Sequence, residues 1–315
     1  MNALRAGLLI ALAAAAPAVA ESGTVDREFH ESFAVEPGDR LVLRHEDGDV
    51  RIVPWDRPEL DVEVVYHAEY SEGGLGVSSE RDFQVDFRRS GNEIRVTGRE
   101  LGGGFRIGWN TLHVFEHVYT VRAPAWLALE LRGDDGDVEI ADWTGDTDIR
   151  LDDGDVTIER FDGTLAVALA DGDLTLRDSA LTESRLDLED GDVELSGVEG
   201  GFRLLTEDGD VTAWALSPRG VYLQTADGDL DLEIGPTADV DLEVRTQDGH
   251  AELALATALS AGFEVTTDDG TVRLDTPAAT DVREEHGQAS GVLGSGAGRI
   301  LVRTRDGRVT LRTAG

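Results

Sequence analysis

The sequence of 315 residues contains no cysteine and no lysine, and all of its bases are arginine. Without cysteine, a disulfide scaffold, a zinc–thiolate site and a thiol nucleophile are excluded. Without lysine, Schiff-base chemistry and the phosphate-binding lysine of a P-loop are excluded. Aromatic residues make up only 6% of the chain, whereas glycine is abundant at 37 residues. No site that depends on a thiol or an amine side chain can be present.

Basic residues are scarce, because only 28 of them stand against 64 acidic residues, and the formal net charge is -36. A field this negative repels phosphate backbones, which makes nucleic acid a poor partner. It also opposes binding to anionic membrane surfaces. We therefore expect no nucleic-acid partner, and instead an envelope protein or glycan, with divalent cations as candidate ligands.

Residues 1–20 have the order of a secretory signal peptide. A basic start at Arg5 is followed by an apolar run from Ala6 to Ala16 and by the small-residue cleavage site Ala18-Val19-Ala20. The run is too short to span a bilayer comfortably, and no later segment approaches that length. A lipid anchor is excluded because no cysteine follows the cleavage site. We expect an exported protein, periplasmic or extracellular, without a membrane span.

An Asp-Gly dipeptide recurs along the chain. Its glycine stands at positions 48, 136, 154, 172, 191, 209, 228, 249, 270 and 307. From Gly136 to Gly228 the steps are 18 or 19 residues, two steps of 21 follow, and the last step of 37 is about two periods. A fixed period of this length is typical of repeat architectures in which each period builds one structural unit.

Aliphatic residues alternate with polar ones on both sides of each Asp-Gly. Five residues before the glycine stand Leu43, Leu131, Ile149, Val167, Leu186, Leu204, Leu223, Val244, Val265 and Val302; two and four residues after it the pattern is equally apolar, as in Val156 and Ile158. Alternation with a period of two indicates half-buried strands. Such short strands bury their apolar face only by stacking, so we predict an all-β fold, a β-solenoid resembling a parallel β-helix with rungs of 18–21 residues. An antiparallel sandwich is the alternative, but it gives no reason for a fixed step.

The turn residues have their own physical reasons. Glycine adopts the positive φ of a turn without a Cβ penalty, and the preceding aspartate can accept hydrogen bonds from the N–H groups of its own turn. Three residues before the glycine, later rungs carry Thr206, Thr225, Thr246, Thr267 and Thr304. We expect these threonines to form an inward column whose hydroxyl groups bond the turns.

The chain divides into the signal peptide 1–20, an N-terminal β cap region 21–122 and the repeats 123–315, with cap and repeats forming one continuous domain. The cap region contains one Asp-Gly copy. Its predicted strands are Arg40–Val53, Glu59–Tyr66, Phe83–Phe87, Glu93–Thr97 and His113–Val121, with a hairpin turn at Arg89–Asn92 and Gly-rich loops at Ser71–Ser79 and Leu101–Gly108. Residues 281–299 read as a Gly-rich interruption before the last rung, Arg299–Leu311. A cap covers core and strand edges that an open end would expose.

Several short motifs resemble the bacterial "putative adhesin" family of unknown function. They are Glu36-Pro37-Gly38, Leu41-Val42-Leu43 and Gly48-Asp49-Val50 near the start, Tyr119–Pro124 leading into Gly136-Asp137-Val138, and Ser290–Gly296 followed by Asp306-Gly307-Arg308-Val309. The similarity covers almost the whole chain after residue 20. It implies an exported or envelope-associated, β-helix-like domain without established catalysis. The doubled acid of the Asp-Gly-Asp turns is a departure from the family pattern.

Seven of the copies read Asp-Gly-Asp, and six of them are consecutive. If the rungs stack, twelve carboxylates line one edge in two columns: Asp135, Asp137, Asp153, Asp155, Asp171, Asp173, Asp190, Asp192, Asp208, Asp210, Asp227 and Asp229. At a spacing of ~4.8 Å, neighbouring charges repel by roughly 0.9 kcal/mol even in water. Such an edge is predicted to gather cations, and calcium suits its oxygen ligands. The competing interpretation is a solvated turn that keeps the edge soluble.

Other candidate chemistry is weaker. His113 and His117 lie on one face of a predicted strand, but zinc needs a third ligand and none is apparent, so ordinary surface histidines are expected. The five tryptophans, Trp55, Trp109, Trp126, Trp143 and Trp214, are expected to pack at rung corners. No cofactor is required and no catalytic residue stands out.

The prediction from sequence is therefore a non-enzymatic binding or structural module. The alternative is a polysaccharide-active lyase or hydrolase on a β-helix. Strand-face arginines such as Arg150, Arg185, Arg203 and Arg245 look scattered rather than clustered, which argues against it.

Overall fold

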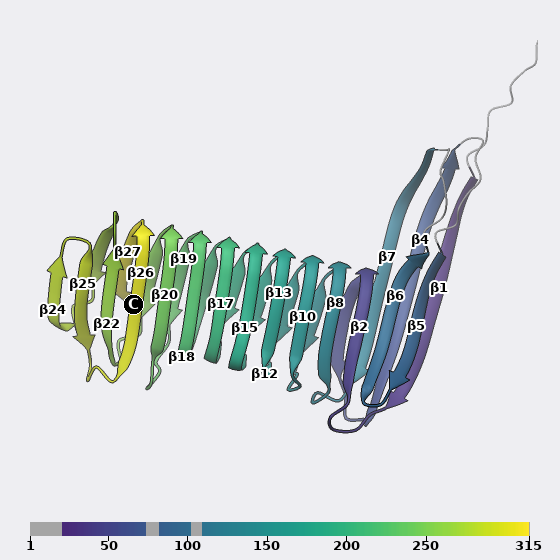
Figure 1. The fold of residues 1–315 in the computed structure, drawn as a ribbon, viewed down its shortest axis with the longest axis horizontal. Coiled ribbons are helices and arrows are strands. Elements are labelled where there is room, and N and C mark those ends of the chain that lie inside the picture. The colour runs from purple at the N-terminus through teal and green to yellow at the C-terminus, as the bar shows by residue number, and fades with distance from the viewer. Residues whose placement is uncertain (1–20, 74–81, 102–108, 315) are drawn as a thin grey trace, which may run out of the picture.

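The computed structural model describes residues 21–73, 82–101 and 109–314, and Figure 1 shows an elongated stack of strands with a bundle of longer strands at its N-terminal end. The predicted signal peptide lies outside the described residues. All regular structure in the described ranges is β-strand, which confirms the all-β fold. No helix in these ranges has the length and apolarity needed to cross a membrane.

The strands fall into three groups along the chain. The first seven are β1 (Glu21–Ala34), β2 (Arg40–Asp47), β3 (Asp49–Pro54), β4 (Glu59–Gly73), β5 (Asp82–Ser90), β6 (Glu93–Leu101) and β7 (Trp109–Ala123). The next are β8 (Ala128–Asp135), β9 (Val138–Ala141), β10 (Thr147–Asp153), β11 (Val156–Glu159), β12 (Asp162–Gly163), β13 (Leu165–Asp171), β14 (Leu174–Arg177), β15 (Ala180–Asp190), β16 (Val193–Ser196), β17 (Glu199–Asp208), β18 (Val211–Asp227), β19 (Leu230–Ile234), β20 (Asp241–Asp248) and β21 (Ala251–Leu255). The last are β22 (Ala261–Thr267), β23 (Thr271–Asp275), β24 (Thr280–Glu285), β25 (Gln288–Leu293), β26 (Gly298–Asp306) and β27 (Arg308–Thr313).

Two parallel sheets make up the stack. The strands that run into the Asp-Gly turns form one sheet, which we call the leading sheet: β2, β8, β10, β13, β15, β17, the second half of β18, β20, β26 and β22. The strands that leave these turns form the other, which we call the following sheet: β3, β9, β11, β14, β16, the first half of β18, β19, β21, β27 and β23. Equivalent repeat positions pair across strands, as in Ile149 with Val167 and Val156 with Leu174. The pairing is parallel, so the antiparallel sandwich is wrong for this part of the chain.

The aliphatic columns predicted from the repeat form the core between the two sheets. Every residue five positions before a repeat glycine is buried, from Leu43 to Val302. On the other side of the turn the columns are also buried, apart from Val272 and Leu274 on β23, which are only partly covered. β23 is the terminal strand of the following sheet and pairs only with β27 among the described strands, which explains its exposure.

The predicted threonine column is confirmed. Thr206, Thr225, Thr246 and Thr304 are register neighbours, with Thr267 next to Thr304, and all five are buried. The hydroxyl of Thr304 donates to the carbonyl oxygen of Asp306 at 2.9 Å, and those of Thr206 and Thr225 bond the equivalent carbonyls at 3.5 and 3.3 Å. These three hydroxyls therefore satisfy turn carbonyls from inside the core, whereas the hydroxyl of Thr246 has no hydrogen-bond partner within the described residues.

The stack does not follow the order of the sequence at its C-terminal end. β26 and β27 lie between β20/β21 and β22/β23, so the last strands of the chain fill an interior position (Figure 1). The repeat is interrupted at 281–299 as expected, but by strands: β24 and β25 form an antiparallel hairpin there, and β25 pairs with β22. After β21 the chain passes over the next rung position and forms the terminal rung, β22 and β23, and the hairpin. It then returns, so that β26 and β27 occupy the position that was passed over.

The N-terminal region extends both sheets. β7 pairs in parallel with β3 and antiparallel with β4, which pairs with β1; β6 pairs in parallel with β2 and antiparallel with β5. The five predicted strands and the hairpin turn after Ser90 are confirmed, whereas β1 was not predicted. The loop predicted at 71–79 is wrong for its first residues, because β4 continues to Gly73. In the other Gly-rich stretch, Leu101 is the last residue of β6. The remainder of both stretches lies outside the described residues. The domain division at residue 123 stays a prediction.

Candidate functional site: the Asp-Gly-Asp edge

The Asp-Gly turns lie in one line along the stack. The aspartates before the glycines are register partners from rung to rung: Asp47, Asp135, Asp153, Asp171, Asp190, Asp208, Asp227, Asp248 and Asp306. The structure thus brings together all twelve aspartates of the predicted cation edge.

The glycines of this edge stack directly on one another. Nine of the ten have φ between 119° and 151°, where a side chain is strained, and Gly270 is the exception. A Cβ on Gly172 would lie 2.1 Å from the carbonyl oxygen of Gly154, and the equivalent clash recurs up to Gly307. Positive φ was predicted, whereas the close approach of successive backbones is a second reason for glycine that the pattern of a single rung does not reveal.

The second aspartate of each turn forms a ladder between rungs. Its Oδ1 accepts a hydrogen bond from the backbone N–H of the equivalent residue in the next rung, as from Asp192 to Asp173 at 2.8 Å. The same bond runs from Asp49 to His250 at 2.8–3.2 Å, and His250 continues it by accepting from the N–H of Arg308 through Nδ1 at 3.1 Å. The prediction was that the aspartate before the glycine accepts from its own turn; the acceptor is instead the aspartate after the glycine, and it serves the neighbouring rung.

We expect Asp173→Ala to destabilise the protein by about 1 kcal/mol, because the N–H of Asp192 loses its acceptor in a solvated position. Asp173→Asn keeps an acceptor oxygen and removes a repelled charge, so its free energy of unfolding should match or exceed that of the wild type. Urea unfolding of both variants checks this. The matched control is Asp171→Ala in the first column; an equal loss in D171A and D173A would contradict the ladder.

The first aspartates of the six consecutive turns are exposed and remain available. The carboxylates of these residues have no hydrogen-bond or ion-pair partner among the described residues: Asp135, Asp153, Asp171, Asp190, Asp208 and Asp227. Toward the C-terminal rungs the first aspartates are no longer all unpaired, because Arg305 pairs with Asp248 at 3.1 Å. Within the described ranges, no three His, Asp or Glu side chains are grouped so as to hold one metal ion. The edge is therefore a line of single carboxylates rather than a chelating pocket.

The histidines differ from the expectation of a surface site. His117 is buried and stacks with Tyr66 and Phe83, each with 4.6 Å between ring centroids, while the side chain of His113 lies outside the described residues. The prediction of a surface histidine is wrong for His117. Its strand, β7, is an internal strand that pairs with β4 on one side and β3 on the other, and its inward side chains lie in the core.

A second buried histidine, His45, was missed. It tilts against Tyr119 with 5.4 Å between ring centroids, and a Cβ on Gly133 would lie 2.3 Å from its Cε1. Neither ring nitrogen of His45 nor the hydroxyl of Tyr119 has a hydrogen-bond partner within the described residues. Burial lowers the pKa of His45 to about 4, and burial together with the nearby His45 lowers the pKa of His117 to about 4. The sequence feature that indicates its burial is its place three residues before Gly48, because the residue at this repeat position points inward in every rung.

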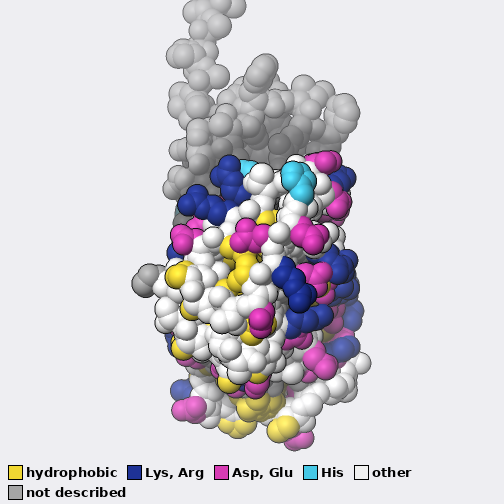
Figure 2. All heavy atoms as spheres, turned by 90° about the vertical axis from the view of Figure 1, so that its left-hand side faces the viewer, with side chains coloured by type: hydrophobic (Ala, Val, Ile, Leu, Met, Phe, Trp, Pro, Cys, Tyr) yellow, Lys and Arg dark blue, Asp and Glu magenta, His cyan; other side chains and the backbone are white. Residues whose placement is uncertain are grey.

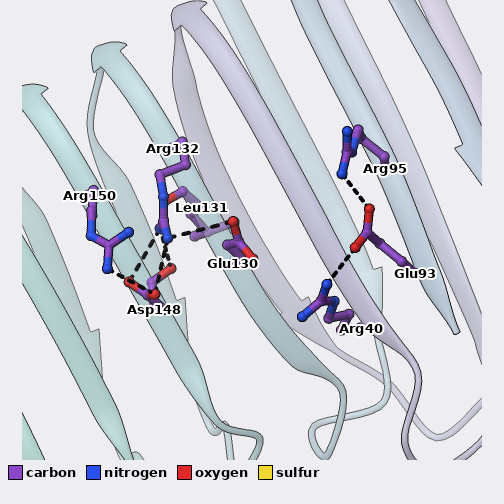
Figure 3. A network of polar contacts seen from close by, with 8 residues as sticks. All are labelled: Arg40, Glu93, Arg95, Glu130, Leu131, Arg132, Asp148 and Arg150. Carbon is purple, nitrogen blue, oxygen red and sulfur yellow. Dashed lines mark hydrogen bonds and ion pairs between the residues drawn. The ribbon is translucent and has the colours of Figure 1, made fainter.

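The outer face of the leading sheet carries arginines at its N-terminal end, and these are neutralised in place. Glu93 pairs with both Arg40 and Arg95 at 2.5 Å (Figure 3). Asp148 pairs with Arg132 at 3.0 Å and with Arg150 at 3.4 Å in the same view. The arginines that looked scattered in the sequence share this sheet face, because Arg132, Arg150 and Arg245 occupy equivalent outward positions.

The tryptophans follow the corner prediction in part. Trp143 is buried and its Nε1 donates to the carbonyl oxygen of Leu127 at 3.1 Å, and that of Trp55 donates to Glu59 at 2.7 Å. Trp126 and Trp214 lie 39% and 45% exposed, so they are only partly packed. The side chain of Trp109 lies outside the described residues. Trp55 and Trp126 line one shallow hollow of about 520 Å³, whereas Trp143 and Trp214 are not among its walls.

The family model of Toastrack DUF4097 matches residues 38–312. The chain belongs to the Toastrack family. The match confirms the family resemblance expected from the short motifs and covers the Toastrack repeats from the first Asp-Gly turn to the last. The search of curated proteins gives no match.

Solved structures give distant likenesses to this Toastrack chain. A "putative adhesin" from Bacteroides fragilis is 12% identical with a TM-score of 0.45 and covers 90% of this chain and 97% of that chain. A "putative cell adhesion protein" from Clostridium sporogenes is 10% identical with a TM-score of 0.24 and covers 91% and 100%. At these scores neither carries an argument about function.

Proposed function

We propose that this protein is an exported, non-enzymatic binding or structural module of the cell envelope, adhesin-like in its role, whose Asp-Gly-Asp edge gathers cations. The observation that supports it best is the alignment of six consecutive Asp-Gly-Asp turns in one register. A coil with rungs of 18–21 residues keeps these turns on one edge. The predicted signal peptide supports export.

Cation gathering follows from the unequal state of the two columns. Both columns are exposed and charged, but Oδ1 of each second aspartate is engaged by a backbone N–H, whereas both carboxylate oxygens of each first aspartate are open to a cation. Neighbours ~4.8 Å apart raise one another's electrostatic energy, and cations along the edge relieve that repulsion. Calcium is favoured over monovalent ions by its charge and its preference for oxygen ligands. Without a chelating group, we expect association along the column with solvation retained.

The cation proposal is tested by thermal melting and calorimetry. Calcium is expected to raise Tm more than sodium chloride of equal ionic strength, with a stabilisation of about 1–2 kcal/mol, or roughly 1.5–3 °C for a chain of this size. The variant D153N/D171N/D190N/D208N should lose this calcium response. The matched control D231N/E233Q/D239N/D281N removes the same charge elsewhere and should keep it. A calcium response no larger than that of magnesium and of matched ionic strength, or equal in both variants, would contradict calcium binding at the edge.

The non-enzymatic proposal has a separate test. Incubation with uronic-acid and neutral polysaccharides in the presence of calcium should release no new reducing ends and no unsaturated products. Turnover of any of these polysaccharides would replace the binding module by a polysaccharide-active enzyme.

A further inference from the structure

The C-terminal part of the leading sheet has an outer face whose charge is opposite to that of the whole molecule. On β17, β18, β20 and β26, between the turn aspartates at one end of the strands and the Glu199–Arg219 pair at the other, the outward acids are Glu207, Asp241 and Glu243, and the outward arginines are Arg203, Arg245, Arg299, Arg303 and Arg305. In a chain with a net charge of -36, an excess of arginine on one face is a local inversion. Viewed from the C-terminal end, arginine side chains gather along one flank (Figure 2). We call Arg203, Tyr222, Arg245, Arg303 and Arg305 the arginine patch.

Two arginines of the arginine patch, Arg203 and Arg303, are less neutralised than the arginines at the N-terminal end of the same face, whereas Arg245 pairs with Glu243 and Arg305 with Asp248. Arg132 and Arg150 share Asp148 (Figure 3), whereas Arg203 and Arg303 have no carboxylate partner within the described part of the chain. Arg245 and Arg303 are direct register partners on β20 and β26, so two guanidinium groups of like charge stand side by side. Such an arrangement is unfavourable in the absence of an anion and favours one when present.

The patch is preorganised around Tyr222. The guanidinium carbon of Arg203 lies 4.7 Å from the centroid of the Tyr222 ring and that of Arg245 lies 5.5 Å from it. The Tyr222 hydroxyl donates to Oε1 of Gln224 at 2.6 Å, and Glu243 accepts from Nε of Arg245 at 2.8 Å. These contacts restrain long side chains that would otherwise lose rotamer freedom on binding.

A shallow hollow of about 400 Å³ opens within this patch. Its walls include three arginines and one acid, together with amides and a hydroxyl: Arg245, Arg303, Arg305, Asp268, Gln224, Gln247 and Thr266. Guanidinium groups bind carboxylates through paired N–H donors, and the amides and hydroxyl offer both donors and acceptors for sugar hydroxyl groups. Arg203 and Arg303 are three strand spacings apart, or roughly 14 Å, so an extended ligand lying across the strands would contact both.

We propose that the arginine patch binds an acidic polysaccharide that carries carboxylate groups, such as a chain of uronic acids. The inference rests on the proposed binding role and names the partner class, but it uses a surface separate from the Asp-Gly-Asp edge. A nucleic acid fits less well, because its dense phosphate charge is repelled by the acidic remainder of the molecule. A uronic-acid chain has one charge for each ring and many hydroxyl groups, which matches spaced arginines separated by amides.

The test is binding of polygalacturonate oligosaccharides, measured by calorimetry at low salt in the presence of EDTA, with dextran as the neutral comparison. We expect binding of the acidic probe only, at least tenfold weaker in R203Q and in R303Q. The matched control is Arg273→Gln, which removes the same charge from an exposed position on β23 of the following sheet and should leave the affinity within twofold.

Other outcomes would overturn the assignment. Absence of binding to the acidic probe, or equal losses in R273Q and R303Q, would remove the patch as a site and leave the cation proposal untouched. Binding that requires calcium and is lost in D153N/D171N/D190N/D208N but not in R303Q would place the glycan on the acidic edge instead. Binding to dextran as strong as to polygalacturonate would remove the charge-based recognition.

Discussion

Deleting residues 298–315 is expected to abolish the native stack, although these residues are the last of the chain. β26 and β27 are interior strands, and their removal separates β20/β21 from β22/β23. The deletion also removes the buried side chains of Ile300, Leu301, Val302, Val309 and Leu311. At about 1.5–3 kcal/mol for each fully buried side chain, the loss is on the order of 10 kcal/mol, comparable to the whole stability of a domain.

The measurement is far-UV circular dichroism with size-exclusion chromatography of the truncated chain. A point-substitution pair gives the matched control. Leu311→Ala, on the interior strand β27, should cost about 2–5 kcal/mol in urea unfolding, whereas Leu274→Ala, on the terminal strand β23, should cost clearly less. A stack in sequence order requires the reverse ranking, and a truncated chain that keeps the native spectrum and Tm would also contradict the observed strand order.

Acidification is expected to destabilise the junction between the N-terminal strands and the stack through His45. Its pKa is about 4 in the folded protein because of burial, whereas an unfolded histidine titrates near 6.5. Below pH 6.5 the unfolded chain therefore binds a proton that the folded chain does not, and stability falls until about pH 4. For His45 alone the loss amounts to about 3 kcal/mol across this window. His117, whose pKa is lowered in the same direction, adds to it without being independent.

The variant His45→Phe is expected to lose less of its free energy of unfolding on acidification than the wild type does, since phenylalanine keeps a ring against Tyr119 and does not titrate. Unfolding in urea at pH 7.0 and pH 4.5 gives the comparison, and the difference between wild type and variant is the relevant quantity because the many carboxylates also titrate. The exposed His286→Gln serves as the control and should follow the wild type. Parallel curves for H45F and wild type would show that buried imidazole does not set the acid limb.

The repeat predicted the core well because the alternation of aliphatic and polar residues that marks buried positions is local to each rung and recurs from rung to rung. Alternation around each Asp-Gly placed Ile149, Val167 and their equivalents inside, and the structure confirms those columns. The turn glycine was also readable, because positive φ is a property of one residue. The ladder formed by Asp155 and Asp173 was not, since it joins neighbouring rungs and depends on where the next backbone N–H lies.

The order of the rungs could not be read from the motif. Each Asp-Gly turn offers the same edges to a neighbour, so nothing in the motif at Gly307 distinguishes an interior position from a terminal one. The step of 37 residues before it was consistent with a missing rung, but the hairpin of β24 and β25 replaced that rung. The arginine patch was missed for a related reason, because Arg203 and Arg303 become neighbours only after the strands are stacked.

The cation-gathering edge is tested most directly by paramagnetic broadening in ¹⁵N-glycine-labelled protein titrated with Mn²⁺. The amide signals of Gly154, Gly172, Gly191 and Gly209 should broaden first and together, and the effect should vanish in D153N/D171N/D190N/D208N. Uniform broadening of all glycine signals, or earlier broadening at Gly220 and Gly262 away from the turns, would show that the aligned carboxylates do not collect metal ions.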